Sequence, residues 1–116
     1  MKSFPYPSYL RTHRDGWALT QPELGLLLGV SGSQISRYEK LVDQPTLPSV
    51  IAAEFIFEEP ARHLFPGIYM AVEQSVIART ADLRERIGLP KTRKAERKLL
   101  LLDALAARAA SDQTTI

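Results

Sequence analysis

Two helix-start signals with a glycine between them dominate the N-terminal half of the chain. The sequence TQPE at residues 20–23 fits a capping box, in which a Thr hydroxyl and a Glu three residues later satisfy N–H groups at a helix start. SGSQ at 31–34 fits the same pattern. Gly29 can adopt a positive φ at no steric cost, which a tight turn between helices requires. The segment therefore predicts a helix over 21–28, a turn at Gly29 and a second helix over 31–41.

The side chains of this segment divide into two faces at helical spacing. Apolar residues stand where they would point into a common core, and a small residue, Gly25, stands where the two helices would cross. The apolar positions are Leu24, Leu28, Val30, Ile35 and Tyr38. The opposite face of the second helix carries Ser33, Ser36, Arg37 and Lys40, which we expect to be exposed.

The rest of the chain also predicts helices. Ser8 is the expected N-cap of a first helix over 9–15, which Gly16 would end. Further helices are expected over 49–57 and 61–65, separated by the Glu58-Glu59-Pro60 break, with Pro66-Gly67 as the next stop. Apolar residues then recur at helical spacing over 68–87 and 91–110, while 111–116 is expected to fray.

The expected fold class is therefore all-α, with a domain of about five helices followed by two C-terminal amphipathic helices. We place the first domain at 1–67, including an extended N-terminal arm over 1–7, and the helical extension at 68–116.

Composition narrows the function classes. The chain of 116 residues has no Cys, which excludes disulfides, thiolate zinc sites and cysteine nucleophiles. We find no acid–base pair, metal-ligand spacing or phosphate loop, so we expect no enzyme and no cofactor. His13 and His63 stand apart from any second ligand or nucleophile pattern, and we interpret both as structural. No apolar run is long enough to cross a bilayer, and no targeting segment is visible, so we expect a soluble, cytoplasmic protein without a membrane partner.

The net charge of +2 is unevenly distributed along the chain. Residues 1–67 hold six Lys and Arg against seven Asp and Glu, whereas 68–116 hold nine against six. The net charge of the first domain therefore does not indicate nucleic-acid binding. Any argument for such binding depends on the two predicted helices over 21–41 and the turn between them.

At residues 10–48 the chain resembles the Cro and phage-repressor helix-turn-helix family, also called the Xre group. The matching residues are Leu10, Arg11, Arg14, Leu19, Thr20, Gln21, Glu23, Leu24, Gly25, Leu28, Gly29, Val30, Ser31, Ile35, Ser36, Arg37, Tyr38, Glu39 and Pro45. Two residues depart from the family: Gly25 stands where Ala is usual, and Leu41 stands where Gly commonly follows the second helix.

The resemblance implies double-stranded DNA as the partner and 31–41 as the recognition helix in the major groove. It implies phosphate contact by Gln21, base contact by Ser33 and Arg37, and an ion pair between Arg14 and Glu39 that ties the first helix to the recognition helix. From the helix starts and the exposed face we add further candidates. The expected base contacts are Ser33, Gln34, Ser36 and Arg37, and the expected phosphate contacts are Thr20, Gln21, Ser31, Gly32 and Lys40.

Arg37 is the best candidate for sequence readout, because a guanidinium can bond O6 and N7 of guanine together. Gln34 has two interpretations: its amide completes the capping box with Ser31, or it contacts adenine. Gly32 would let DNA approach the backbone closely.

The C-terminal helices predict partners beyond DNA. We expect homodimerisation through one or both, which would place two recognition helices about one DNA turn apart, and the function expected from this is a sequence-specific transcriptional regulator, in the simplest case a repressor. The basic run Lys91, Arg93, Lys94, Arg97 and Lys98 is either a phosphate clamp or a solvated helix face. The alternative function is an antitoxin-like or adaptor protein, whose C-terminal helices bind another protein and whose DNA binding is secondary.

Overall fold

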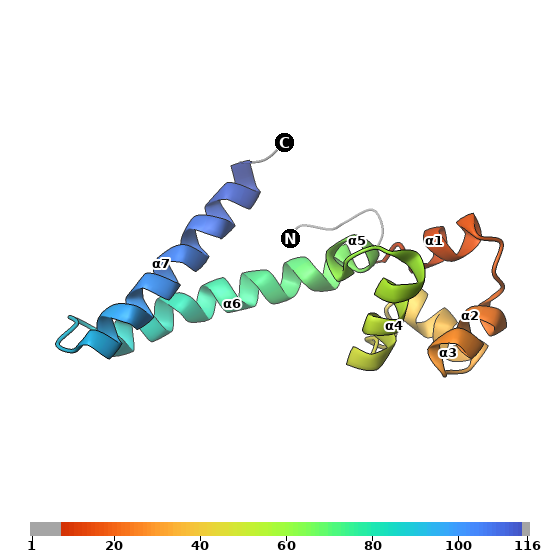
Figure 1. The fold of residues 1–116 in the computed structure, drawn as a ribbon, viewed down its shortest axis with the longest axis horizontal. Coiled ribbons are helices and arrows are strands. Elements are labelled where there is room, and N and C mark those ends of the chain that lie inside the picture. Colours follow the sequence, from red (N-terminus) through yellow and green to blue (C-terminus); the bar gives the residue numbers. More distant parts are fainter. Residues whose placement is uncertain (1–7, 115–116) are drawn as a thin grey trace. The chain divides into compact units, whose positions relative to one another are not determined.

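A computed structural model describes residues 8–114, with the side chains of 8–111. Within that range the chain forms helices and no strand, so the predicted all-α class is confirmed (Figure 1). The helices are α1 (Leu10–Gly16), α2 (Gln21–Leu28), α3 (Gly32–Glu39), α4 (Leu47–Phe57), α5 (Ala61–Leu64), α6 (Pro66–Ile87) and α7 (Arg93–Thr114). The chain separates into two compact units, and the boundary between Met70 and Ala71 lies inside α6. The proposed N-terminal arm, 1–7, lies outside the described residues.

One hydrophobic core holds the first unit together. Its buried side chains come from α1 to α5 and the residue that follows: Leu10, Leu24, Ile35, Tyr38, Ala53, Phe57, Leu64 and Phe65. Leu10, Leu24, Ile35 and Leu64 are completely buried, and full burial of such a side chain stabilises a fold by about 1.5–3 kcal/mol. Leu28 and Val30 are half-buried and pack against this cluster. The predicted core positions of the α2–α3 segment are therefore confirmed.

Helix α1 differs from the prediction at both ends. Its N-cap is Tyr9 and not Ser8, because the Ser8 hydroxyl donates to the Glu39 carbonyl, 3.1 Å away. Gly16 lies inside the helix, and the left-handed residue that ends it is Ala18, with φ 58°. The N–H groups of Ala18 and Leu19 then bond to carbonyls of the last turn, which is the Schellman pattern that glycine usually supports.

The segment from 46 to 66 starts its helices earlier than expected. Thr46 caps α4 by accepting from the Ser49 N–H at 3.3 Å, so α4 begins at Leu47 and not at Ser49. The predicted break after Phe57 is confirmed, with Glu58 in the left-handed region at φ 52°. The short helix α5 ends at Leu64, before Pro66 as predicted, but α6 begins at Pro66 and not at Ile68. Proline fits the first turn of a helix, where its missing N–H has no intrahelical acceptor to lose.

The second unit contains the rest of α6 and α7. Gly88, with φ 64°, ends α6 as predicted. The hydroxyl of Thr92 accepts from the Ala95 N–H at 3.0 Å, so α7 begins at Arg93 and not at 91. Fraying over 111–114 is contradicted, since α7 continues to Thr114, and 115–116 lie outside the described residues.

An ion pair between Arg84 of α6 and Asp103 of α7 joins these two helices. Leu102 is buried, but much of the α6 apolar stripe is not: Tyr69, Val72, Val76 and Leu83 are 40–55% exposed. No helix in the described part of the chain combines the length and apolarity that crossing a membrane would require.

Candidate functional site

Helices α2 and α3 are fixed by the caps and the turn that the sequence predicts. The Thr20 hydroxyl accepts from the Glu23 N–H at 3.2 Å, while the Glu23 carboxylate accepts from the Thr20 N–H at 2.8 Å, which completes the capping box. Gly29 follows α2 with φ 80°, so its left-handed turn is confirmed. Ser31 caps α3 by accepting from the Gln34 N–H at 3.0 Å. These local bonds set where both helices begin.

Two glycines let the helices approach closely. A Cβ on Gly25 would lie 2.6 Å from the Val30 carbonyl oxygen, closer than real Cβ atoms come to their neighbours. A Cβ on Gly32 would lie 3.0 Å from the Pro22 nitrogen, so the first turns of α2 and α3 nearly touch. Gly32, a predicted phosphate contact, is thus half-buried against α2. Because neither glycine has a side chain, α2 and α3 can pack at this short distance, and we call this contact the glycine crossing.

The exposed face of α3 carries the predicted polar residues. Ile35 and Tyr38 are buried, whereas Ser33, Arg37 and Lys40 are exposed and Ser36 is half-buried. The predicted division of α3 into inner and outer faces is therefore confirmed. A shallow hollow of about 620 Å³ joins this face to the start of α2, and it is lined by Gln21, Pro22, Gly32, Ser33, Ser36 and Arg37. Candidates for base and phosphate contact thus share one surface.

The helix predicted over 31–41, which is α3 in the structure, ends two residues earlier than expected. α3 stops at Glu39, and Leu41 adopts a left-handed conformation with φ 52°. The Leu41 N–H bonds to the Tyr38 carbonyl at 3.1 Å, and the Val42 N–H bonds to the Arg37 carbonyl at 2.9 Å. This is again a Schellman ending, with leucine at the left-handed position where glycine is usual. It turns the chain back toward α3.

The capping-box interpretation of Gln34 is also wrong. The Gln34 amide group does not return to Ser31 but donates to Asp43 Oδ2 at 3.1 Å. The Ser31 hydroxyl therefore accepts in a one-sided cap, and the Gln34 side chain is part of the α3 surface.

Asp43 is the residue that sequence reasoning missed. Arg37 donates to it twice, from Nε to Oδ2 at 2.7 Å and from Nη2 to Oδ1 at 3.1 Å. These bonds, with a smaller contribution from Gln34, lower the pKa of Asp43 to about 2. The same pairing raises the pKa of Arg37 above its ordinary value. Since Asp43 follows Arg37 by six residues, no helical-spacing rule indicates the pair.

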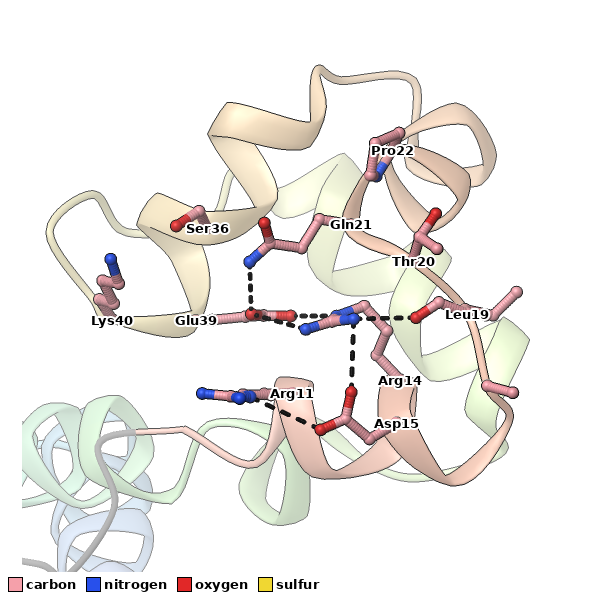
Figure 2. A pocket seen from close by; sticks show the side chains of 11 residues that line it. Arg11, Arg14, Asp15, Leu19, Thr20, Gln21, Pro22, Ser36, Glu39 and Lys40 are labelled. Carbon is pink, nitrogen blue, oxygen red and sulfur yellow. Dashed lines mark hydrogen bonds and ion pairs between the residues drawn. The ribbon is translucent and has the colours of Figure 1, made fainter.

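A second hollow of about 830 Å³ lies between α1, the start of α2 and the end of α3, over a buried ion pair (Figure 2). Arg14 Nε lies 2.6 Å from Glu39 Oε2, and the two side chains are 10% and 6% exposed. Arg14 also donates from Nη1 to the Leu19 carbonyl at 2.8 Å. The pair that the resemblance implied between α1 and α3 is therefore present.

Gln21 joins the same cluster. Its Nε2 donates to Glu39 Oε1 at 3.0 Å, so the amide nitrogen points into the hollow toward Glu39, as Figure 2 shows. Lys40 and Arg11 also line this hollow. Both are exposed, and they supply positive charge near its edge.

The remaining candidates lie elsewhere. The basic residues 91, 93, 94, 97 and 98 are all exposed, in the second unit. His13 hydrogen-bonds through Nδ1 with the Tyr9 carbonyl at 2.9 Å and packs against Phe57 with ring centroids 5.7 Å apart. His63 Nδ1 lies 2.8 Å from Glu59. Among the described residues no three potential ligands gather into a metal site.

Comparisons with protein-family models, with curated proteins and with solved structures give no match for this chain.

Proposed function

We propose that this protein is a sequence-specific, double-stranded DNA-binding regulator of transcription, in the simplest case a repressor, and that α2 and α3 form a helix-turn-helix with α3 in the major groove. The observation that supports this most is the outer face of α3. Its exposed Ser33, Arg37 and Lys40 stand beside the first turn of α2, on a helix that is held by a glycine crossing.

The dimensions and chemistry of this surface suit DNA. The major groove is wide enough for one α-helix, and its base edges are read by short polar side chains and by arginine. The first N–H groups of a helix have no intrahelical acceptor and carry the positive end of the helix dipole, so the starts of α2 and α3 favour phosphate. Because these starts nearly touch through Gly32 and Pro22, they would meet the DNA backbone together.

A homodimer is part of the proposal. The sequence of the first unit carries little net charge, so one copy would bind DNA weakly, whereas two copies on one face of the duplex would bind cooperatively. The exposed apolar residues of α6, Val72, Val76 and Leu83, offer a surface for the second copy.

The test is titration of a labelled random duplex at two salt concentrations, followed by selection of bound sequences. Arg37→Ala should lower affinity for the selected sequence by about 5- to 150-fold, which corresponds to the 1–3 kcal/mol of one bidentate base contact. Arg62→Ala removes an exposed arginine of α5 and should leave it unchanged. Binding that is insensitive to salt and equal for both variants would contradict the proposal.

A protein-interaction module is the second candidate. The observation that favours it is an apolar stripe on α4, where Leu47, Ile51 and Phe55 recur every four residues and are 71%, 55% and 85% exposed. A monomeric DNA-binding domain has little reason to expose such a stripe. Absence of duplex binding at low salt would favour this candidate over the first.

A further inference from the structure

Asp43 is held beside Arg37 and Gln34, two of the candidates for base readout. The Schellman ending at Leu41 turns the chain so that Asp43 returns to the exposed face of α3. Its carboxylate then accepts two hydrogen bonds from Arg37 and one from Gln34, and the Oδ2 atom is shared by both side chains. Residues 34 and 37 are therefore tied to one carboxylate and held as a unit.

The edge of the guanidinium that Asp43 occupies decides what the pair can do. An arginine has five N–H groups in a planar fork. Asp43 binds the side edge, formed by Nε and Nη2, which leaves the terminal edge, formed by Nη1 and the second N–H of Nη2, directed away from the carboxylate. That terminal edge presents two parallel N–H groups, which match the O6 and N7 acceptors of guanine.

We propose that Asp43 is a positioning residue for specificity, which holds Arg37 with its terminal edge toward guanine. This rests on the proposed DNA-binding function. Arginine has several rotatable bonds, and fixing them before binding removes an entropy cost that would otherwise be incurred at the interface. The negative charge of Asp43 also opposes close approach of phosphates, so it weakens binding that does not depend on sequence. Both effects favour guanine at one position of each half-site.

The experiment is selection from a random duplex pool with the full-length protein, comparing wild type, Asp43→Asn and Asp43→Glu. Asn keeps the shape of Asp43 but loses the charge-assisted bonds to Arg37. We expect wild type to select guanine at one position, and Asp43→Asn to lower that preference about fivefold or more while random-duplex affinity stays level or rises. Asp43→Glu should restore part of the preference. If Asp43 had only a structural role, Asp43→Asn would lower the guanine preference and the random-duplex affinity together.

Glu59→Gln is the matched control, because it removes one carboxylate charge, which lies 2.8 Å from His63 Nδ1 and outside the face of α3. It should leave the guanine preference unchanged. Thermal unfolding of each variant checks that the fold is intact.

Three results would overturn the inference without deciding against the proposed function. One is a guanine preference that Asp43→Asn retains. Another is wild-type binding without guanine selection, which leaves the proposed function intact. The third comes from the free protein, where the Arg37 Nε–H should give a slowly exchanging NMR signal that Asp43→Asn weakens. An identical signal in wild type and Asp43→Asn would show that Asp43 does not hold Arg37. Absence of any duplex binding by wild type, with the NMR difference present, would instead overturn the proposed function and the inference drawn from it.

Discussion

Replacing Arg14 with Met should destabilise the first unit more than any other single charge removal in α1. Arg14 and Glu39 are 10% and 6% exposed, and the guanidinium donates to the carboxylate at 2.6 Å and 3.3 Å. Methionine fills the space of the arginine stem but offers no donor. Glu39 would then keep Gln21 as a neutral donor and lose its cation.

The magnitude follows from leaving a charge buried without its partner. Removing one member of a buried ion pair costs about 3–5 kcal/mol. The hollow above the pair is open, so water can reach Glu39 once Arg14 is gone, and we expect the lower end, about 3 kcal/mol. For a chain of this length each kcal/mol lowers the unfolding midpoint by about 4 °C, which gives a decrease of roughly 12 °C.

Urea and thermal denaturation monitored by circular dichroism measure this loss. Arg11→Met is the control, because Arg11 pairs with Asp15 at 3.5 Å while 73% exposed, and exposed pairs contribute under about 1 kcal/mol. In a double-mutant cycle, Arg14→Met and Glu39→Gln should together cost at least about 1 kcal/mol less than the sum of the single changes. A loss below 1 kcal/mol for Arg14→Met, or strict additivity, would refute the reasoning.

Three further predictions concern the glycine crossing, the end of α1 and the pH dependence of Asp43. Gly25→Ala should lower the free energy of unfolding by about 1–3 kcal/mol, because its Cβ would lie 2.6 Å from a backbone carbonyl. Gly16→Ala, with open space around it, should raise the free energy of unfolding by up to about 1 kcal/mol. A change of the same sign for both variants in urea denaturation would contradict the close approach of α2 and α3 at Gly25. Ala18→Gly should raise the unfolding midpoint, since relief of the left-handed conformation at φ 58° outweighs the entropy of glycine by about 0.5–1 kcal/mol; a lower midpoint would be the contrary result. Asp43 has a pKa of about 2 in the folded protein, below its ordinary 3.8, so its stabilising contribution is present above pH 4 and is lost as the pH falls through 2. Arg37→Gln should move that pKa toward 3.8 in an NMR titration of the Asp43 carboxyl carbon, and an unchanged value would show that the pair does not form in solution.

The sequence by itself determined the local features of α2 and α3. Thr20, Glu23, Gly29 and Ser31 act within three or four residues of their partners, so their roles follow from chain geometry alone. The inner face of α3 was equally predictable, because burial of Ile35 and Tyr38 follows from helical periodicity. The Arg14–Glu39 pair was accessible only through the family resemblance.

Only the tertiary structure decided how the surface side chains are paired. Gln34 had a local partner in Ser31 and yet bonds to Asp43, since the left-handed Leu41 brings that carboxylate within reach. A leucine gives no sign in sequence that it will adopt a conformation typical of glycine. Partners of long polar side chains depend on which loop returns to them, and a charge-assisted bond across a turn outweighs a weaker local one. For this reason the sequence could locate the candidate surface but could not show that Arg37 and Gln34 share one carboxylate.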